Sequence, residues 1–144
     1  MKVVYAETSA VLAWLLGEEG SRRPAAILDS AEKVVTSVLT LLEASRGILR
    51  AANQGRLTAA DASRLKGLLA RSAVGWDLME MTPDIRARAA EAFPVEPIRT
   101  LDAVHLATML DFARLFPEVS VLSFDARIIA NLEPLGLSEA SKEA

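Results

Sequence analysis

The chain of 144 residues opens on a short apolar run that ends abruptly in polar residues. Lys2–Ala6 is rich in β-branched and aromatic residues, which is typical of a buried strand. Glu7, Thr8 and Ser9 follow, and an apolar helical pattern then runs to Gly17. Thr8 or Ser9 offers a hydroxyl that can cap such a helix, and glycine commonly ends one. The pattern therefore predicts a strand that enters a helix through a polar corner at Glu7.

The same alternation of short apolar runs and helical patterns continues along the chain. Further strands are predicted at Lys33–Thr36, Asp77–Met81 and Val119–Leu122. A polar turn is expected at Glu18–Arg23. Helical patterns cover residues 24–30, 37–53, 58–74, 82–93, 100–115 and 125–132. Strands that alternate with helices predict a parallel sheet covered by helices on both faces. The expected fold class is therefore α/β, with three layers in the order helix, sheet, helix.

The length fits one domain, because a chain of this size can bury roughly 70% of its unfolded surface. We expect the domain to span residues 1–137, followed by a flexible tail at 138–144, where the residues are small and polar. No apolar run approaches the ~20 residues of a membrane span. The start lacks the apolar segment and cleavage site of a signal peptide. These features predict a cytoplasmic protein with no membrane partner.

The composition limits the chemistry that the chain can perform. There are no cysteines and one histidine, His105, so thiolate and multi-histidine metal sites are excluded and a conventional Ser-His-Asp triad is disfavoured. Any metal must be held mainly by oxygen, which favours Mg²⁺, Mn²⁺ or Ca²⁺. The net charge of −3 argues against a basic clamp for nucleic acid. A local basic patch remains open, formed by Arg22, Arg23, Arg46, Arg50 and Arg99.

Two acids follow predicted strands at corresponding places. Glu7 comes after the first strand and Asp125 after the last, each where a helix begins. Ligands of open α/β sheets bind at the carboxyl edge of the strands, so the two carboxylates are expected to lie close together if their strands are neighbours. Asp125 can also be interpreted simply as a helix cap. Glu7 is harder to explain in that way, since Glu is a poor cap and two hydroxyl residues follow it.

Two further acids lie within predicted helices. Asp102 is in the first turn of an apolar helix, where the helix dipole favours an acid. His105 stands one turn further on and could hydrogen-bond Asp102, although a lone histidine in such a helix is more often a satisfied core residue. Glu43 is interior to its helix and, taken alone, would be interpreted as a surface partner of Arg46 or Arg50.

Considered together, the four acids predict a cation site. Carboxylates gathered in one pocket raise each other's pKa and are stable only if a cation neutralises them. An acidic pocket lined by oxygen suits Mg²⁺ or Mn²⁺. Such an ion can lower the pKa of a bound water, orient a phosphodiester and offset charge on the leaving oxygen. Phosphoryl chemistry is therefore the function that these residues favour.

Four segments also carry a family resemblance. They are a strand followed by Glu7-Thr8-Ser9, a helix that carries Glu43, the segment Arg99–Ala107 (RTLDAVHLA), and Ser123-Phe124-Asp125 after the last strand. In this order and spacing the set resembles the PIN-domain ribonucleases of the VapC toxin type. The resemblance extends over nearly the whole chain, from Val3 to about Gly136, and the RTLDAVHLA segment is its most specific part.

The resemblance implies a PIN-like α/β/α fold whose central parallel sheet has four or five short strands. It implies an endoribonuclease that depends on Mg²⁺ or Mn²⁺ and cleaves RNA phosphodiester bonds with a metal-activated water. The implied catalytic acids are Glu7, Glu43, Asp102 and Asp125, of which Glu7, Asp102 and Asp125 hold the metal, with Thr8 and Ser9 in support. The candidates for contacts with the RNA backbone are Arg46, Arg50 and Arg99. The implied partners are a second copy of the chain and a VapB-type antitoxin whose tail lies over the acidic groove.

Two features depart from the family pattern. The first acidic position is normally Asp, and Glu7 carries an extra methylene in a site where a displacement of ~1 Å can cost about a hundredfold in rate. Family members often end with a short extra strand, but here Leu135–Leu137 passes directly into polar residues, so that strand is expected to be short or missing. The first departure keeps an alternative open, a catalytically weakened PIN-fold module that acts through RNA or partner binding. A phosphoacceptor receiver domain is disfavoured because no lysine follows the last predicted strand until Lys142.

Overall fold

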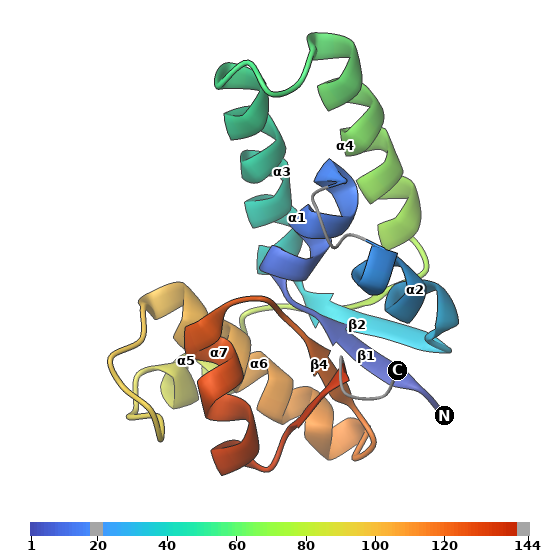
Figure 1. Ribbon diagram of the computed structural model, residues 1–144. Helices are drawn as coiled ribbons and strands as arrows, with labels where there is room; N and C mark the ends of the chain where they lie inside the picture. Colours follow the sequence, from blue (N-terminus) through green and yellow to red (C-terminus); the bar gives the residue numbers. More distant parts are fainter. Residues whose placement is uncertain (18–21, 141–144) are drawn as a thin grey trace.

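The computed structural model describes residues 1–17 and 22–140, which form a five-stranded parallel sheet with helices on both faces (Figure 1). The strands are β1 (Val3–Ala6), β2 (Lys33–Ser37), β3 (Asp77–Met79), β4 (Ser120–Leu122) and β5 (Ser138–Glu139). The helices are α1 (Thr8–Leu16), α2 (Arg22–Ser30), α3 (Val38–Asn53), α4 (Ala59–Ala73), α5 (Pro83–Ala89), α6 (Thr100–Leu115) and α7 (Ala126–Leu132), and a 3-10 turn, η1 (Glu133–Leu135), follows α7.

β1 lies at the centre of the sheet, whose strand order is β3-β2-β1-β4-β5. It pairs in parallel with β2 on one side and with β4 on the other, and Ala6 of β1 is aligned with Leu122 of β4. The carboxyl ends of β1 and β4 therefore meet at one edge of the sheet. The residues that follow them, Glu7 and Ser123, are brought side by side, as the strand pattern predicts for neighbouring strands.

The two faces of the sheet bury different helices because successive side chains of a strand point to opposite faces. Tyr5 of β1 packs in a core cluster with Met109 and Phe112 of α6. Ala6, its neighbour, packs in a second cluster with helices α1, α3 and α4, including Ile48 of α3. Figure 1 shows α1 to α4 on one side of the sheet and α5 to α7 on the other, with α3 and α4 extending beyond it as a paired arm.

Several element boundaries differ from the sequence prediction. β3 ends at Met79 and not at Met81. Arg22 already belongs to α2, whereas residues 18–21 of the predicted polar turn lie outside the described part of the chain. α5 ends at Ala89 and not at residue 93.

The predicted flexible tail needs a larger correction. Ser138 and Glu139 form β5 and pair in parallel with β4, and Ala140 is only 3% exposed. The short last strand is therefore present, and residues 138–140 belong to the folded domain. A segment of two residues has too few alternating positions to be recognised as a strand from its sequence. Its pairing partner becomes evident only in the folded sheet.

One helix cap also differs from the prediction. Glu7, and not Thr8 or Ser9, caps α1, since its carboxylate accepts a hydrogen bond from the backbone N–H of Ser9. Arg99 is the residue before the first turn of α6. Asp125 does cap α7, with its carboxylate accepting from the next turn. Within the described residues, none of the helices is both long and apolar enough to span a membrane.

Candidate active site

The first predicted acid, Glu7, is buried and held by hydroxyl groups at the end of β1. Its side chain is 5% exposed. The hydroxyls of Ser9 and Ser123 both donate to Glu7 Oε1, at 2.5 and 2.6 Å. The backbone N–H of Ser9 donates to the other carboxylate oxygen at 3.2 Å. These three donors offset the cost of burying the carboxylate, which explains how a glutamate can occupy a corner where it is a poor cap by itself.

The two serines also connect the corner after β1 with the corner after β4. Ser9 Oγ accepts a hydrogen bond from the backbone N–H of Phe124 at 2.8 Å. Ser123 Oγ accepts one from the backbone N–H of Asp125 at 3.0 Å. The position of Glu7 is thereby linked to that of Asp125 through short contacts at the sheet edge.

Glu43 reaches the same region from α3, and its partners are not the arginines of its own helix. His105 Nε2 lies 2.6 Å from Glu43 Oε1, and the hydroxyl of Thr8 donates to the same oxygen at 2.7 Å. Burial disfavours the charged carboxylate, but the hydrogen bonds from His105 and Thr8 outweigh it, so that the pKa of Glu43 lies below its ordinary value. The contacts with His105 and Thr8 therefore favour the ionised form of Glu43. The interpretation of Glu43 as a surface partner of Arg46 or Arg50 was wrong.

His105 is a buried core residue, as the sequence predicts, but its partner is not Asp102. Its Nδ1 lies 2.8 Å from the hydroxyl of Tyr5, and both side chains are almost completely inaccessible to solvent. Burial raises the pKa of Tyr5, so the phenol keeps its proton. If that proton is donated to Nδ1, the proton on Nε2 is left to point at Glu43. Tyr5, His105 and Glu43 thus form a chain from the core to the sheet edge.

Asp102 and Asp125 are bridged by one guanidinium group, that of Arg99. Arg99 Nε donates to Asp102 Oδ2 at 3.2 Å, and its terminal nitrogen donates to Asp125 Oδ2, also at 3.2 Å. The Asp102 side chain is 7% exposed, whereas that of Arg99 is 65% exposed. Its hydrogen bonds to Asp102 raise the pKa of Arg99. The cation that the acidic cluster requires is therefore supplied, in this structure, by the protein itself.

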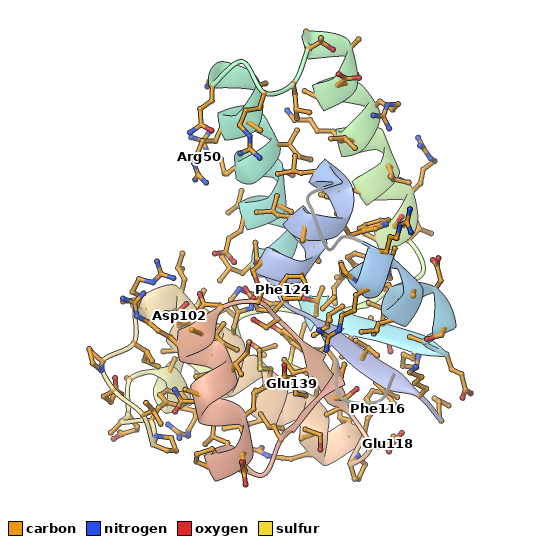
Figure 2. The ribbon with its side chains drawn as sticks, in the orientation of Figure 1. Arg50, Asp102, Phe116, Glu118, Phe124 and Glu139 are labelled. Atoms are coloured by element: carbon orange, nitrogen blue, oxygen red, sulfur yellow. The ribbon has the colours of Figure 1, made fainter. Side chains whose placement is uncertain are left out.

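A cavity of about 340 Å³ opens at this edge, lined by Glu43, Arg99, Thr100, Leu101 and Asp102. Figure 2 shows Asp102 near the start of α6, with Phe124 on the neighbouring corner after β4. Arg46 and Arg50 instead line a separate hollow along α3, together with Leu49, Asn53 and Gln54. Of the three arginines proposed for RNA contacts, Arg99 alone lines the cavity that contains two of the acids.

The fit of this site to a divalent cation depends on Arg99. Within residues 1–17 and 22–140, no three acidic or histidine side chains converge into a ready metal cluster. The donors at the edge are nevertheless carboxylate and hydroxyl oxygens, which Mg²⁺ and Mn²⁺ prefer. Asp102 and Asp125 already share one cationic partner. The side chains therefore fit such an ion by their chemistry, at a position that the guanidinium of Arg99 now neutralises.

The sequence-based reasoning missed two of the residues described above. Ser123 binds Glu7, and its position between β4 and Asp125 is the only signal in the sequence that could have drawn attention to it. Tyr5 was interpreted as a strand residue alone, because its link to His105 joins positions 100 residues apart. Thr8, predicted as a supporting hydroxyl, contacts Glu43 and lies 3.3 Å from His105 Nε2.

Comparison with known proteins places this arrangement in a family. The model of the PIN domain matches residues 4–131. The chain belongs to the PIN-domain family. It is 34% identical over 138 residues to Ribonuclease VapC35 of Mycobacterium tuberculosis, covering 94% of each chain. The resemblance to VapC-type PIN domains drawn from the sequence is thus confirmed.

Solved structures agree on the fold. The crystal structure of VapC20 of M. tuberculosis, a toxin that cleaves the sarcin-ricin loop, aligns with a TM-score of 0.66 at 19% identity, covering 88% of this PIN domain and 93% of VapC20. A chain of a toxin–antitoxin complex from Klebsiella pneumoniae aligns with a TM-score of 0.65 at 15% identity, covering 95% and 97% of the two chains. The predicted PIN-like α/β/α fold with a central parallel sheet is therefore confirmed.

Proposed function

We propose that this PIN domain is the endoribonuclease toxin of a toxin–antitoxin pair and acts in the cytoplasm. Its relative VapC35 is a ribonuclease, and VapC20, which shares its fold, cleaves the sarcin-ricin loop. The observation that carries the proposal is where the four acids lie: Glu7 and Asp125 follow neighbouring strands at the carboxyl edge of one parallel sheet, Asp125 shares Arg99 with Asp102, and Glu43 contacts Thr8 beside Glu7. Ligands bind at this edge in open α/β folds, and carboxylates are suited to hold the cation that phosphodiester cleavage uses.

We assign the cation as Mg²⁺ or Mn²⁺, with Glu7, Asp102 and Asp125 as the carboxylates that would hold it. Such an ion lowers the pKa of a water and offsets charge on the leaving oxygen. The protein's own contribution is to hold the carboxylates in place. Ser9 and Ser123 fix Glu7, and α7 fixes Asp125 through its first turn. Glu43, kept ionised by His105 and Thr8, borders the cavity beside Asp102 as a proton acceptor.

The proposed partners are RNA, a VapB-type antitoxin and a second copy of the chain. Three exposed apolar side chains support a partner that covers the site, because each stands next in sequence to one of the acids. Leu42, Leu101 and Phe124 are 62%, 46% and 44% exposed and precede Glu43, Asp102 and Asp125. Exposed apolar groups beside a charged cavity are typical of a surface that binds another molecule. A chain of this fold belongs to the toxin–antitoxin complex from K. pneumoniae.

A second candidate function is a PIN-fold module that binds RNA or a partner without cleaving RNA efficiently. One structural feature favours it. Both oxygens of Glu7 already accept hydrogen bonds, from the Ser9 N–H and from the Ser9 and Ser123 hydroxyls. Three of the roughly four lone-pair sites of this carboxylate are thus occupied, which leaves little of it for a metal ion.

One experiment separates the two functions. Mn²⁺ is titrated into the purified protein, and a mixed RNA pool is then incubated with the wild type and with Asp102→Asn. The matched control is Asp111→Asn, the same change on the same helix at a residue that pairs with Arg114. The endoribonuclease predicts Mn²⁺ binding and cleavage that Asp102→Asn removes and Asp111→Asn retains. Absence of Mn²⁺ binding, or cleavage that Asp102→Asn leaves intact, rejects the enzyme in favour of the binding module.

A further inference from the structure

The contacts of Arg99 divide the four acids into two pairs with different neutralising groups. Glu7 and Glu43 accept from hydroxyl, backbone and imidazole donors. In the described part of the chain, every hydrogen bond that the Asp102 carboxylate accepts comes from Arg99, namely from its backbone N–H, its Nε and its terminal nitrogen. Asp102 is therefore a buried carboxylate whose charge partner is a single side chain.

Asp125 uses its two oxygens for different purposes. Oδ1 accepts from the backbone N–H groups of Arg127 and Ile128 and so caps α7. Oδ2 accepts from the terminal nitrogen of Arg99. Oδ1 thus stabilises the start of α7, and Oδ2 pairs with the cationic side chain of Arg99. The guanidinium thus contacts both of the aspartates that would hold the proposed ion.

The position of Arg99 allows its side chain to move away from the two carboxylates. Its backbone is extended before the first turn of α6, and its side chain is largely exposed. An exposed arginine in an ion pair contributes little to stability and exchanges readily with solvent. A divalent ion carries twice the charge in a smaller volume and binds carboxylate oxygens directly. Removal of the guanidinium without replacement, by contrast, would leave Asp102 buried and unpaired, which is strongly unfavourable.

We propose that Arg99 is a built-in counter-cation, which neutralises Asp102 and Asp125 when no divalent ion is present and which the ion must displace in order to bind. This inference rests on the proposed function, since it assumes that the site takes a divalent ion. It adds a regulatory property to that function, because the apparent affinity for the ion includes the release of Arg99. Without metal, Arg99 thereby offsets one of the two negative charges of Asp102 and Asp125.

The test is Mn²⁺ binding measured without RNA, by calorimetry or by the electron paramagnetic resonance of the free ion. Arg99→Gln removes the competing charge and is expected to bind Mn²⁺ about three- to tenfold more tightly than the wild type. Without metal its unfolding midpoint is lower, and saturating Mn²⁺ raises that midpoint more than it does in the wild type. Arg99→Lys keeps the charge but cannot fork between two carboxylates, so its affinity lies between those of the wild type and Arg99→Gln.

The matched control is Arg114→Gln. Arg114 pairs with Asp111 on the same helix and at the same spacing of three residues, away from the four acids. Its Mn²⁺ affinity should equal that of the wild type.

Mn²⁺ binding by Arg99→Gln that is equal to or weaker than that of the wild type shows that Arg99 positions the acids, and it overturns the proposal that the ion displaces Arg99. Metal-dependent RNA cleavage by the wild type would then leave the proposed function standing. Absence of Mn²⁺ binding in every variant overturns both. If Arg99→Gln does not fold, Arg99→Lys decides, since affinity no higher than that of the wild type rejects the proposal.

Discussion

The hydroxyl of Tyr5 lies 2.8 Å from Nδ1 of His105, inside the interface between the central strand and α6. The two rings also meet edge to face, at 86° and with centroids 6.1 Å apart. On its other side the imidazole contacts Glu43, which stands at the sheet edge. The orientation of a carboxylate in the candidate active site is therefore fixed by a phenol in the core, on the strand that ends at Glu7.

Tyr5→Phe tests this chain of contacts. The change removes one hydrogen bond to a fully buried imidazole, so we expect the free energy of unfolding to fall by about 1–3 kcal/mol. His105 then loses the hydrogen-bond partner that sets its tautomer, and its hydrogen bond with Glu43 weakens. Since that hydrogen bond lowers the pKa of Glu43, the acid limb of RNA cleavage should move to higher pH. A pH profile that keeps its shape while stability falls would show that Tyr5 is only structural.

The pKa of Glu43 also predicts how stability depends on pH. A carboxyl group whose pKa is lower in the folded state stabilises the fold above its unfolded pKa, about 4.3 for Glu. This contribution is lost as the pH falls through the lowered folded value. We expect wild type to be more stable than Glu43→Gln at pH 7, with the difference shrinking as the pH falls through the lowered folded pKa of Glu43. Urea unfolding at several pH values measures it, and Glu118→Gln, an exposed residue, is the control. A difference that is independent of pH would contradict the assignment.

Glu7→Asp tests the glutamate that stands where the family normally has an aspartate. The shorter side chain restores the family geometry, so we expect RNA cleavage to increase. It also withdraws the carboxylate from the hydroxyls of Ser9 and Ser123, which should reduce stability by about 1 kcal/mol. Single-turnover cleavage rates and unfolding by urea measure the two effects separately. Equal or slower cleavage by the variant would mean that the site is adapted to glutamate.

Asn131→Ala is expected to loosen the segment that leads into α6. Asn131 is fully buried, and its amide accepts from the backbone N–H of Val95 and donates to the carbonyl of Val95 at 2.9 and 3.0 Å. Its loss leaves two backbone groups without these partners and should reduce the free energy of unfolding by about 1–3 kcal/mol. Faster hydrogen exchange at the Val95 amide would locate the effect. Asn53→Ala, at an exposed position on α3, should change stability by less than about 0.5 kcal/mol.

The layered fold and the edge that carries the site could be predicted because they depend on local patterns. The apolar run of β1, the helical spacing of α6 and the polar corners after β1 and β4 are all continuous in sequence. β5 could not be predicted in this way, since two residues become a strand only through their pairing with β4.

The contacts between side chains of the site could not be predicted from the sequence, for a different physical reason. Glu43 and His105 are 62 residues apart, and nothing in either helix indicates that their side chains meet. The role of Glu7 as a cap contradicts its intrinsic preference and depends on Ser123, a residue from the far end of the chain. From the sequence, Arg99 is simply the residue before a predicted helix. Its contact with Asp125 becomes evident only in the folded structure.

The strand order has a consequence for the newly synthesised chain. β1 is made first, yet the neighbour on one of its sides is β4, which follows more than a hundred residues later. Until residues 120–125 leave the ribosome, Glu7 lacks Ser123 and the sheet edge lacks Asp125. A polypeptide that has not yet reached β4 therefore holds only part of its acid set, and its Glu7 lacks the hydroxyl of Ser123 that holds it in the folded chain.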